Sequence, residues 1–225
     1  MARPLIAIFD LDGTLADTLP AIAGAMNSVL RAAGLPEHPE ESYRRFAGDG
    51  AAMLVRRATR HEFDRDEAAV ARLVAAFRER DEKLDATLAR AYEGVPEMLA
   101  DLERGGALLA VLTNKEHPEA RALVDRLFGL ERFVAVEGAR EGVATKPDPS
   151  LLLSIVRDAG LTPRDAAFIG DTDTDMRTGR NAGVCTVGCA WGFRDEHELR
   201  ATGADAVAHH PRDVPVIIAS GCREG

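Results

Sequence analysis

The sequence predicts an α/β protein in which a doubly wound, Rossmann-like parallel sheet carries an inserted all-helical domain. Two observations predict this fold. From residue 90 onward, short apolar segments alternate with segments of helical pattern, which is typical of parallel βαβ units. Residues 16–89 are almost entirely helical in pattern, and one apolar strand precedes them. We therefore expect a core domain of residues 1–15 and 90–225, interrupted by an inserted helical domain of residues 16–89.

The first strand is expected at residues 5–9, a continuous apolar run that ends at an aspartate. Four helices are expected in the inserted segment. Their apolar residues recur at spacings of three and four, and the glycines after residues 33 and 47 end two of them. These helices are predicted at residues 17–33, 40–46, 51–59 and 66–84.

In the second part of the chain, continuous apolar runs predict buried strands, and amphipathic segments predict the helices between them. The strands are predicted at residues 107–112, 133–136, 166–169, 184–187 and 206–208. The helices are predicted at residues 96–104, 117–127, 150–159 and 176–182.

The composition is that of an ordinary globular protein. Of 225 residues, 46% are hydrophobic and 29% are charged, with a formal net charge of −9. This charge argues against general binding to nucleic acid or to anionic membranes, and an anionic substrate would need local cations or a metal. We expect a cytoplasmic location, because we find no signal peptide and no membrane span. Cys185, Cys189 and Cys222 are too few for a disulfide framework, and the first two are expected as buried thiols.

Two aspartates directly follow the first strand. Asp10 and Asp12 are two residues apart, so an extended chain places both carboxylates on one side, and Gly13 allows a sharp turn. Two like charges this close are costly unless a positive group lies beside them. The pattern indicates a carboxylate nucleophile, a second carboxylate for proton transfer and a divalent cation. A solvated turn at the strand end is the alternative.

Polar residues also follow the later strands. Ligands bind beyond the carboxyl ends of strands in open parallel sheets, so these residues are expected to lie together. They are Thr113 and Asn114, then Lys146, then Asp171 and Asp175.

Each of these residue types suits phosphoryl chemistry. Asp10 and Asp171, on adjacent strands, can provide the carboxylate oxygens that Mg²⁺ prefers. Lys146 can neutralise a phosphoryl group, and Thr113 can donate hydrogen bonds to its oxygens. Asp10 is expected to be ionised at neutral pH, because the ordinary pKa of aspartate is about 3.9. Asp12 must hold a proton for the leaving group and later accept one from water.

On these motifs the chain resembles the phosphatases of the haloacid dehalogenase superfamily. All four motifs of the superfamily are present in order, and the helical segment matches the position of the small cap of that superfamily. They are Asp10-Leu11-Asp12-Gly13-Thr14-Leu15, Thr113, Lys146, and Gly170-Asp171 with Asp175.

The resemblance implies a role for each matched residue. Asp10 would attack phosphorus to form an aspartyl-phosphate, and Asp12 would act as general acid and then as general base. Asp10, the backbone carbonyl of Asp12 and Asp171 would bind Mg²⁺, with Asp175 beside the metal or bound to it through water. The resemblance also implies that Thr113, Asn114 and Lys146 bind the substrate phosphate.

Within this superfamily, three segments resemble the phosphoglycolate phosphatases. They are residues 112–115, residues 190–193, and residues 45–50 with 54–58. The last includes Asp49, which adds a carboxylate where that family usually has a Gly-Asn or similar pair. Arg45 is a candidate for binding a substrate carboxylate, or else a solvated arginine.

We therefore expect a Mg²⁺-dependent phosphatase acting on a small phosphorylated metabolite, similar to phosphoglycolate. The alternatives are a phosphosugar mutase of the same superfamily and a non-catalytic binding domain. The oligomeric state is open. His117 is expected at a helix N-terminus or near the site, Asp173 as a solvated helix cap, and Trp191 in packing between the core and a loop.

Overall fold

The computed structural model describes residues 5–221, which form two compact units. In the larger unit, the described residues form a six-stranded sheet in the order β5-β4-β1-β6-β7-β8, and all neighbouring strands are parallel. This confirms the predicted α/β fold. The strands are β1 (Ile6–Phe9), β4 (Leu108–Glu116), β5 (Phe133–Ala139), β6 (Ala166–Gly170), β7 (Cys185–Cys189) and β8 (Ala206–Ala208).

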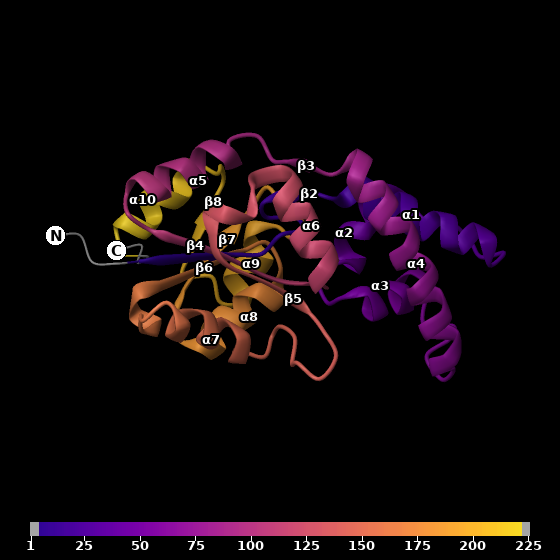
Figure 1. Cartoon of the computed structure of the whole chain (residues 1–225). Coiled ribbons are helices and arrows are strands. Elements are labelled where there is room, and N and C mark those ends of the chain that lie inside the picture. The colour runs from indigo at the N-terminus through magenta and orange to yellow at the C-terminus, as the bar shows by residue number, and fades with distance from the viewer. Residues whose placement is uncertain (1–4, 222–225) are drawn as a thin grey trace. The chain divides into compact units, whose positions relative to one another are not determined.

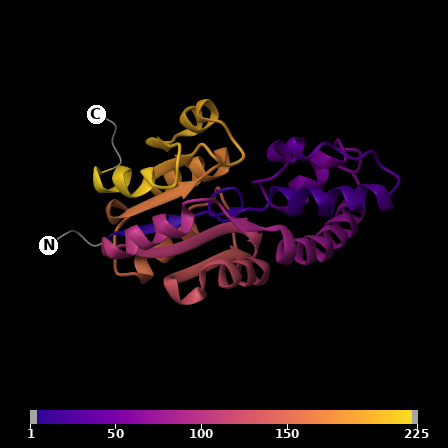
Figure 2. The ribbon, with the colours of Figure 1, turned by 90° about the horizontal axis from the view of Figure 1, so that it is seen from above.

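Helices cover both faces of this sheet. Helix α5 (Val95–Arg104) runs beside α10 (Asp213–Ala219) on one face (Figures 1 and 2). Helices α7 (Ser150–Asp158) and α8 (Asp173–Ala182) pack together on the other (Figure 1). The remaining elements of this unit are α6 (His117–Phe128), α9 (Glu196–Thr202) and the 3₁₀ turns η2 (Leu130–Arg132) and η3 (Pro163–Asp165).

The sheet core explains why these apolar runs form strands. Ile6 and Ile8, two residues apart on β1, face the same side and pack with Phe168 of β6 and Leu152 of α7. All four side chains are fully buried. Because both faces of the sheet are covered, its central strands have continuous apolar sequences instead of alternating ones.

Several element boundaries differ from the prediction. Strand β4 continues through the polar residues up to Glu116, because its backbone still pairs with β5 at Ala139. Helix α8 begins at Asp173, three residues earlier than expected, and α9 and α10 had no predicted counterpart.

The cysteines only partly match the prediction. Cys189 is a buried free thiol, whereas Cys185 is half-buried and disulfide-bonded, so it is not the core thiol that was expected. Cys222 lies outside the described residues. Within residues 5–221, we find no helix with the length and apolar character that a membrane span requires.

Residues Asp17–Arg90 form the second unit. Its helices are α1 (Leu19–Ala32), α2 (Tyr43–Phe46), α3 (Ala51–Ala58) and α4 (Glu67–Leu88), with a 3₁₀ turn η1 (Glu40–Ser42). The predicted helix at 40–46 is thus a 3₁₀ turn followed by one helical turn, and α4 ends four residues later than expected. Two short strands, β2 (Ala16–Asp17) and β3 (Arg90–Ala91), pair where the chain passes between the units.

The second unit has its own core. Tyr43 is fully buried, and its hydroxyl donates a hydrogen bond to Asn27 Oδ1 at 2.6 Å. The ring of Tyr43 meets Phe46 edge-on, with the centroids 5.4 Å apart. Asp66 caps α4 by accepting a hydrogen bond from the backbone N–H of Ala69.

Candidate active site at the carboxyl ends of the strands

The order of the strands brings the predicted site residues together. Strand β1 lies between β4 and β6, with Phe9 paired to Val111 on one side and to Ile169 on the other. Asp10 therefore emerges beside the end of β6, where its backbone N–H donates to the carbonyl of Ile169 at 2.9 Å. Asp171 follows directly after β6.

Three carboxylates form a buried cluster at this edge. One oxygen from each of Asp10, Asp171 and Asp175 lies within 4.8 Å of the other two. Burial, followed by the charge of Asp175, raises the pKa of Asp10 to about 7. Burial, followed by the charges of Asp175 and Asp10, also raises the pKa of Asp171 well above its ordinary value. The ionised cluster is therefore costly without a positive group among its members.

Lys146 supplies part of that positive charge. Its Nζ lies 2.9 Å from Asp10 Oδ1 and donates a hydrogen bond to Asp175 Oδ1 at 2.6 Å. The lysine side chain is almost completely buried. Burial alone would lower the pKa of Lys146, but the charges of Asp10 and Asp175 more than offset it, so the pKa is raised. Lys146 therefore remains protonated.

Asn114 holds the backbone that carries this lysine. Its Oδ1 accepts a hydrogen bond from the backbone N–H of Lys146 at 3.0 Å, and its Nδ2 donates to the Lys146 carbonyl at 3.3 Å. Asn114 thus contacts Lys146 through both ends of its amide. Thr113, one residue earlier on β4, is buried, and its hydroxyl accepts a hydrogen bond from the backbone N–H of Lys115 at 3.2 Å.

Asp175 is fixed by the start of α8. Thr172 caps this helix, and the Asp175 carboxylate accepts hydrogen bonds from the Thr172 backbone N–H at 3.0 Å and hydroxyl at 2.7 Å. This capping box was readable from the spacing of Thr172 and Asp175. Asp173 is instead the first residue of the helix and pairs with Arg177, so it is not the cap that was predicted.

Glycines make room for the acidic side chains. A Cβ atom on Gly13 would lie 2.2 Å from Asp171 Oδ2, and a Cβ on Gly192 would lie 2.2 Å from Asp171 Cβ. A Cβ on Gly170 would lie 2.4 Å from Asp175 Cβ. Gly13 also has a φ of +87°, a backbone conformation that residues with a Cβ rarely adopt. Any side chain at these positions would displace a carboxylate.

Asp12 has a different environment from Asp10. Its Oδ1 is a buried atom without a hydrogen-bond partner, and the Nζ of Lys115 lies 3.6 Å from it. Each aspartate of the pair is thus accompanied by its own lysine. The sequence reasoning gave Lys115 no separate role, although its position two residues after Thr113 on a strand predicts that both share one face.

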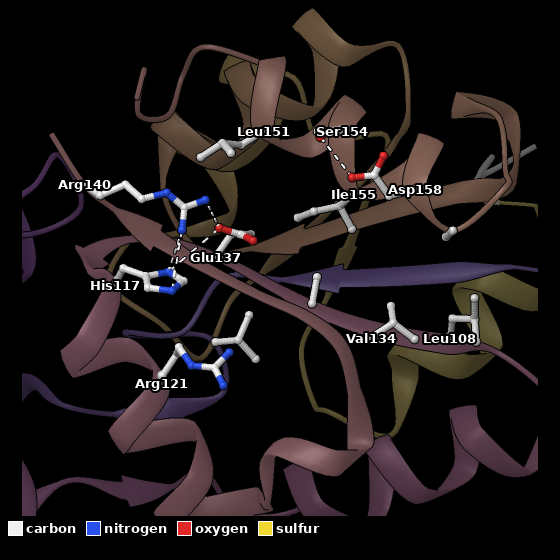
Figure 3. Close-up of a pocket in the computed structure, with 13 residues that line it drawn as sticks. Leu108, His117, Arg121, Val134, Glu137, Arg140, Leu151, Ser154, Ile155 and Asp158 are labelled. Carbon is white, nitrogen blue, oxygen red and sulfur yellow. Dashed lines mark hydrogen bonds and ion pairs between the residues drawn. The ribbon is translucent and has the colours of Figure 1, made fainter. Parts of the chain in front are cut away.

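Two other candidates lie elsewhere. His117 begins α6, and its imidazole lies beside Glu137 and Arg140 of a pocket at the β5 edge of the sheet (Figure 3). Its side-chain contacts are with Glu137, Arg140 and the backbone N–H of Gly138, none of which belongs to the acidic cluster. Arg45 is an exposed residue of α2, in the second unit. In that unit Asp49 forms an ion pair of 2.5 Å with Arg57, so its extra carboxylate is neutralised locally.

The donor set fits a hard divalent cation. Three buried carboxylates face one ammonium group, Lys146, which leaves an excess of negative charge in a site that burial makes costly. Carboxylate oxygens are the ligands that Mg²⁺ and Ca²⁺ prefer. A divalent cation beside Asp10 and Asp171 would balance this charge.

Comparisons with known proteins agree with this geometry. The model of the haloacid dehalogenase-like hydrolase family matches residues 7–189. A phosphoglycolate phosphatase of Mesorhizobium japonicum is 36% identical over 93% of this chain and 92% of its own. An N-acetylmuramic acid 6-phosphate phosphatase of Pseudomonas aeruginosa is 34% identical over 92% of this chain and 91% of its own.

The fold is shared with solved structures as well. The crystal structure of a predicted phosphoglycolate phosphatase from Haemophilus somnus superposes with a TM-score of 0.88 at 26% sequence identity, covering 97% of this chain and 99% of that one. Sequence, fold and motif residues thus lead to the same assignment: this chain belongs to the haloacid dehalogenase-like hydrolase family.

Proposed function

We propose that this hydrolase is a Mg²⁺-dependent phosphomonoesterase that acts on a small organic phosphate through an aspartyl-phosphate intermediate. The observation that carries the proposal is the position of Lys146 between Asp10 and Asp175, in a cluster completed by Asp171. One site then offers a carboxylate nucleophile, a cation for phosphoryl oxygens and an oxygen-rich cation site. Phosphoryl transfer depends on such positioning and charge stabilisation.

In the first step, an Asp10 carboxylate oxygen attacks phosphorus, and the bond from phosphorus to the leaving oxygen breaks. Asp12 donates a proton to that oxygen, so that an alcohol departs. In the second step, Asp12 removes a proton from water as the water attacks phosphorus. The bond from phosphorus to Asp10 then breaks, which releases inorganic phosphate and restores the Asp10 carboxylate.

The cation would be held by Asp10, Asp171 and the backbone carbonyl of Asp12, with Asp175 beside it or bound through water. When bound, Mg²⁺ supplies positive charge to the phosphoryl oxygens. Lys146 adds its own charge there and favours the ionised form of Asp10, and Asn114 positions Lys146 through its backbone. Thr113 is available to donate its hydroxyl proton to a phosphoryl oxygen.

The relatives suggest the class of substrate. Phosphoglycolate and N-acetylmuramic acid 6-phosphate, in the names of two relatives, are both phosphate esters of carboxylic acids. We therefore propose a small phosphomonoester that also carries a carboxylate. The unit Asp17–Arg90 would act as the cap domain that selects it, with Arg45 as a candidate partner for the carboxylate. Asp49, the extra carboxylate of this unit, is paired with Arg57, so its negative charge is balanced locally.

Phosphate release tests this proposal. We expect the wild-type protein to release phosphate from p-nitrophenyl phosphate with Mg²⁺ and not with EDTA, and Asp10→Asn to be inactive. Asp158→Asn, an exposed aspartate, is the matched control and should keep full activity. Absence of turnover by the wild-type protein with every phosphate ester would contradict the proposed reaction.

A panel of esters then tests the substrate class. We expect a higher kcat/KM for 2-phosphoglycolate and N-acetylmuramic acid 6-phosphate than for glycerol phosphate and N-acetylglucosamine 6-phosphate, which lack the carboxylate. Equal kcat/KM values across the panel would contradict the proposed class and leave the phosphomonoesterase reaction intact. Conversion of a sugar 1-phosphate to its 6-phosphate would instead identify a mutase.

A further inference from the structure

We propose that Trp191 is a positioning residue for the cation site, acting through Thr14 on Asp171. The inference rests on the proposed cation site, but Trp191 itself lies outside the motifs that define that site. Trp191 lies in residues 190–195, the loop between β7 and α9. This loop makes separate contacts with the loop after β1 and with Asp171.

The contacts form a continuous chain of hydrogen bonds. Trp191 Nε1 donates to the carbonyl oxygen of Thr14 at 3.0 Å, and the Thr14 hydroxyl donates to Asp171 Oδ1 at 2.6 Å. The backbone N–H of Phe193 donates to the other oxygen, Asp171 Oδ2, at 2.8 Å. Both oxygens of Asp171 are therefore oriented by donors that depend on the conformation of this loop.

Packing restricts Asp171 further. Gly192 lies against its Cβ and Gly13 against its Oδ2, so closely that a Cβ on either glycine would lie 2.2 Å from an Asp171 atom. Thr14 follows Gly13, whose backbone has wide conformational freedom. The hydrogen bond from Trp191 to the Thr14 carbonyl restricts the backbone at this point. The indole N–H can only donate a hydrogen bond, which suits a carbonyl acceptor.

These contacts leave Asp171 able to bind a cation. A carboxylate oxygen has two lone-pair sites, and each oxygen of Asp171 uses one for the hydrogen bond described above. The remaining sites can face a metal ion. Groups that hydrogen-bond to metal ligands in this way typically change metal affinity tenfold or more when they are removed. Trp191 acts one contact further away, so we expect an effect at the lower end of that range.

The test is isothermal titration calorimetry with Mn²⁺, in which the Trp191→Phe variant is compared with the wild-type protein. Phenylalanine keeps an aromatic ring and removes the N–H donor. We expect the Kd for Mn²⁺ to rise about tenfold while the melting temperature of the metal-free protein stays close to that of the wild type. Phe128→Leu, in α6 and packed against Phe133, serves as the control and should keep the wild-type Kd.

A double-mutant cycle places Trp191 and Thr14 on one chain of contacts. Thr14→Val removes the hydroxyl that contacts Asp171. If Trp191 acts through Thr14, the combined variant should bind Mn²⁺ about as weakly as Thr14→Val alone. If the Kd of the combined variant instead rises by the product of the two single effects, Trp191 does not act through Thr14.

The outcomes separate this inference from the proposed function. An unchanged Kd in Trp191→Phe overturns the role of Trp191 and leaves the cation site standing. Absence of Mn²⁺ binding by the wild-type protein overturns both. If Trp191→Phe does not fold, the inference is tested by the tryptophan fluorescence of the wild-type protein. Trp191 is its single tryptophan, so the fluorescence reports on this loop alone. We expect this fluorescence to change during the Mn²⁺ titration, with the same midpoint as the heat signal. Constant fluorescence while Mn²⁺ binds would overturn the inference.

Discussion

The Nζ atom of Lys146 lies 2.9 Å from Oδ1 of Asp10, and both side chains are almost completely buried. These two residues are far apart in sequence and belong to different loops. Their contact places a permanent positive charge beside the proposed nucleophile. It also makes the stability of the core unit depend on the same charges that the reaction requires.

Replacing Lys146 tests this dependence. In Lys146→Met, the Asp10 and Asp175 carboxylates lose their common partner, so we expect the free energy of unfolding to fall by about 3 kcal/mol and activity to be lost. Urea unfolding measures the first effect. Lys83→Met, which removes an exposed lysine paired with Glu79, should cost less than about 0.5 kcal/mol. Equal costs for the two variants would contradict a buried ion pair at Lys146.

The raised pKa of Asp10 predicts a pH dependence of stability without metal. Because its pKa is about 7 in the folded protein and near 3.9 when unfolded, the folded state holds more protons between these values. The free energy of unfolding should therefore fall as pH rises from about 4 to about 7. Urea unfolding in EDTA at several pH values measures this dependence. The free energy of unfolding should change less steeply with pH for Asp10→Asn than for the wild-type protein. Saturating Mg²⁺ should also make the pH dependence of the wild-type protein less steep. Identical slopes for both proteins in EDTA would be incompatible with this prediction.

Replacing Gly13 tests whether Asp171 must keep its present position. Gly13→Ala adds a Cβ that would lie 2.2 Å from Asp171 Oδ2 at a φ of +87°. We expect kcat to fall about 100-fold, because the carboxylate must shift. Gly183→Ala is the matched control, since Gly183 has a φ of +67° and no atom within 4 Å of the added Cβ. It should lose about 1 kcal/mol of stability and keep its kcat. A normal kcat in a folded Gly13→Ala protein would show that Asp171 need not occupy this position.

Asn114 tests how Lys146 is positioned. Asn114→Ala removes two hydrogen bonds to the Lys146 backbone, and we expect a fall in kcat of about tenfold. Asn181→Ala is the control, because Asn181 also donates to this loop, at the carbonyl of Pro147, from an exposed position. Steady-state kinetics on p-nitrophenyl phosphate distinguish the two variants. A large rise in KM with unchanged kcat in Asn114→Ala would instead support direct binding of substrate phosphate by Asn114.

The sequence was most informative where one local pattern implies one structure. The run before Asp10 predicted a buried strand, and the alternation of strands with helices predicted a parallel sheet. Strand β4 was predicted too short because Thr113, Asn114 and Lys115 are polar. Backbone pairing with β5 does not depend on side-chain polarity, so the strand continues to Glu116.

Partners distant in sequence were not predictable in the same way. The resemblance implied that Asn114 binds the substrate phosphate, whereas its contacts with Lys146, 32 residues away, could be seen only in the folded structure. Trp191 was expected only to pack, and its hydrogen bond to Thr14 spans 177 residues of sequence. The spacing of Thr172 and Asp175 is that of a capping box and could have predicted the start of α8. Asp171 and Asp175 were instead interpreted only as residues of a cation site.

The most direct test of the account is to trap the phosphoryl group on Asp10. Wild-type protein and Asp12→Asn would be mixed with p-nitrophenyl phosphate and Mg²⁺, quenched in acid, and digested for mass spectrometry. An aryl leaving group needs little protonation, whereas release of phosphate from Asp10 needs a base. We therefore predict that the Asp12→Asn protein accumulates one phosphoryl group on the peptide that contains Asp10. Turnover by the wild-type protein with the phosphoryl group on another residue, or full turnover by Asp10→Asn, would contradict the account.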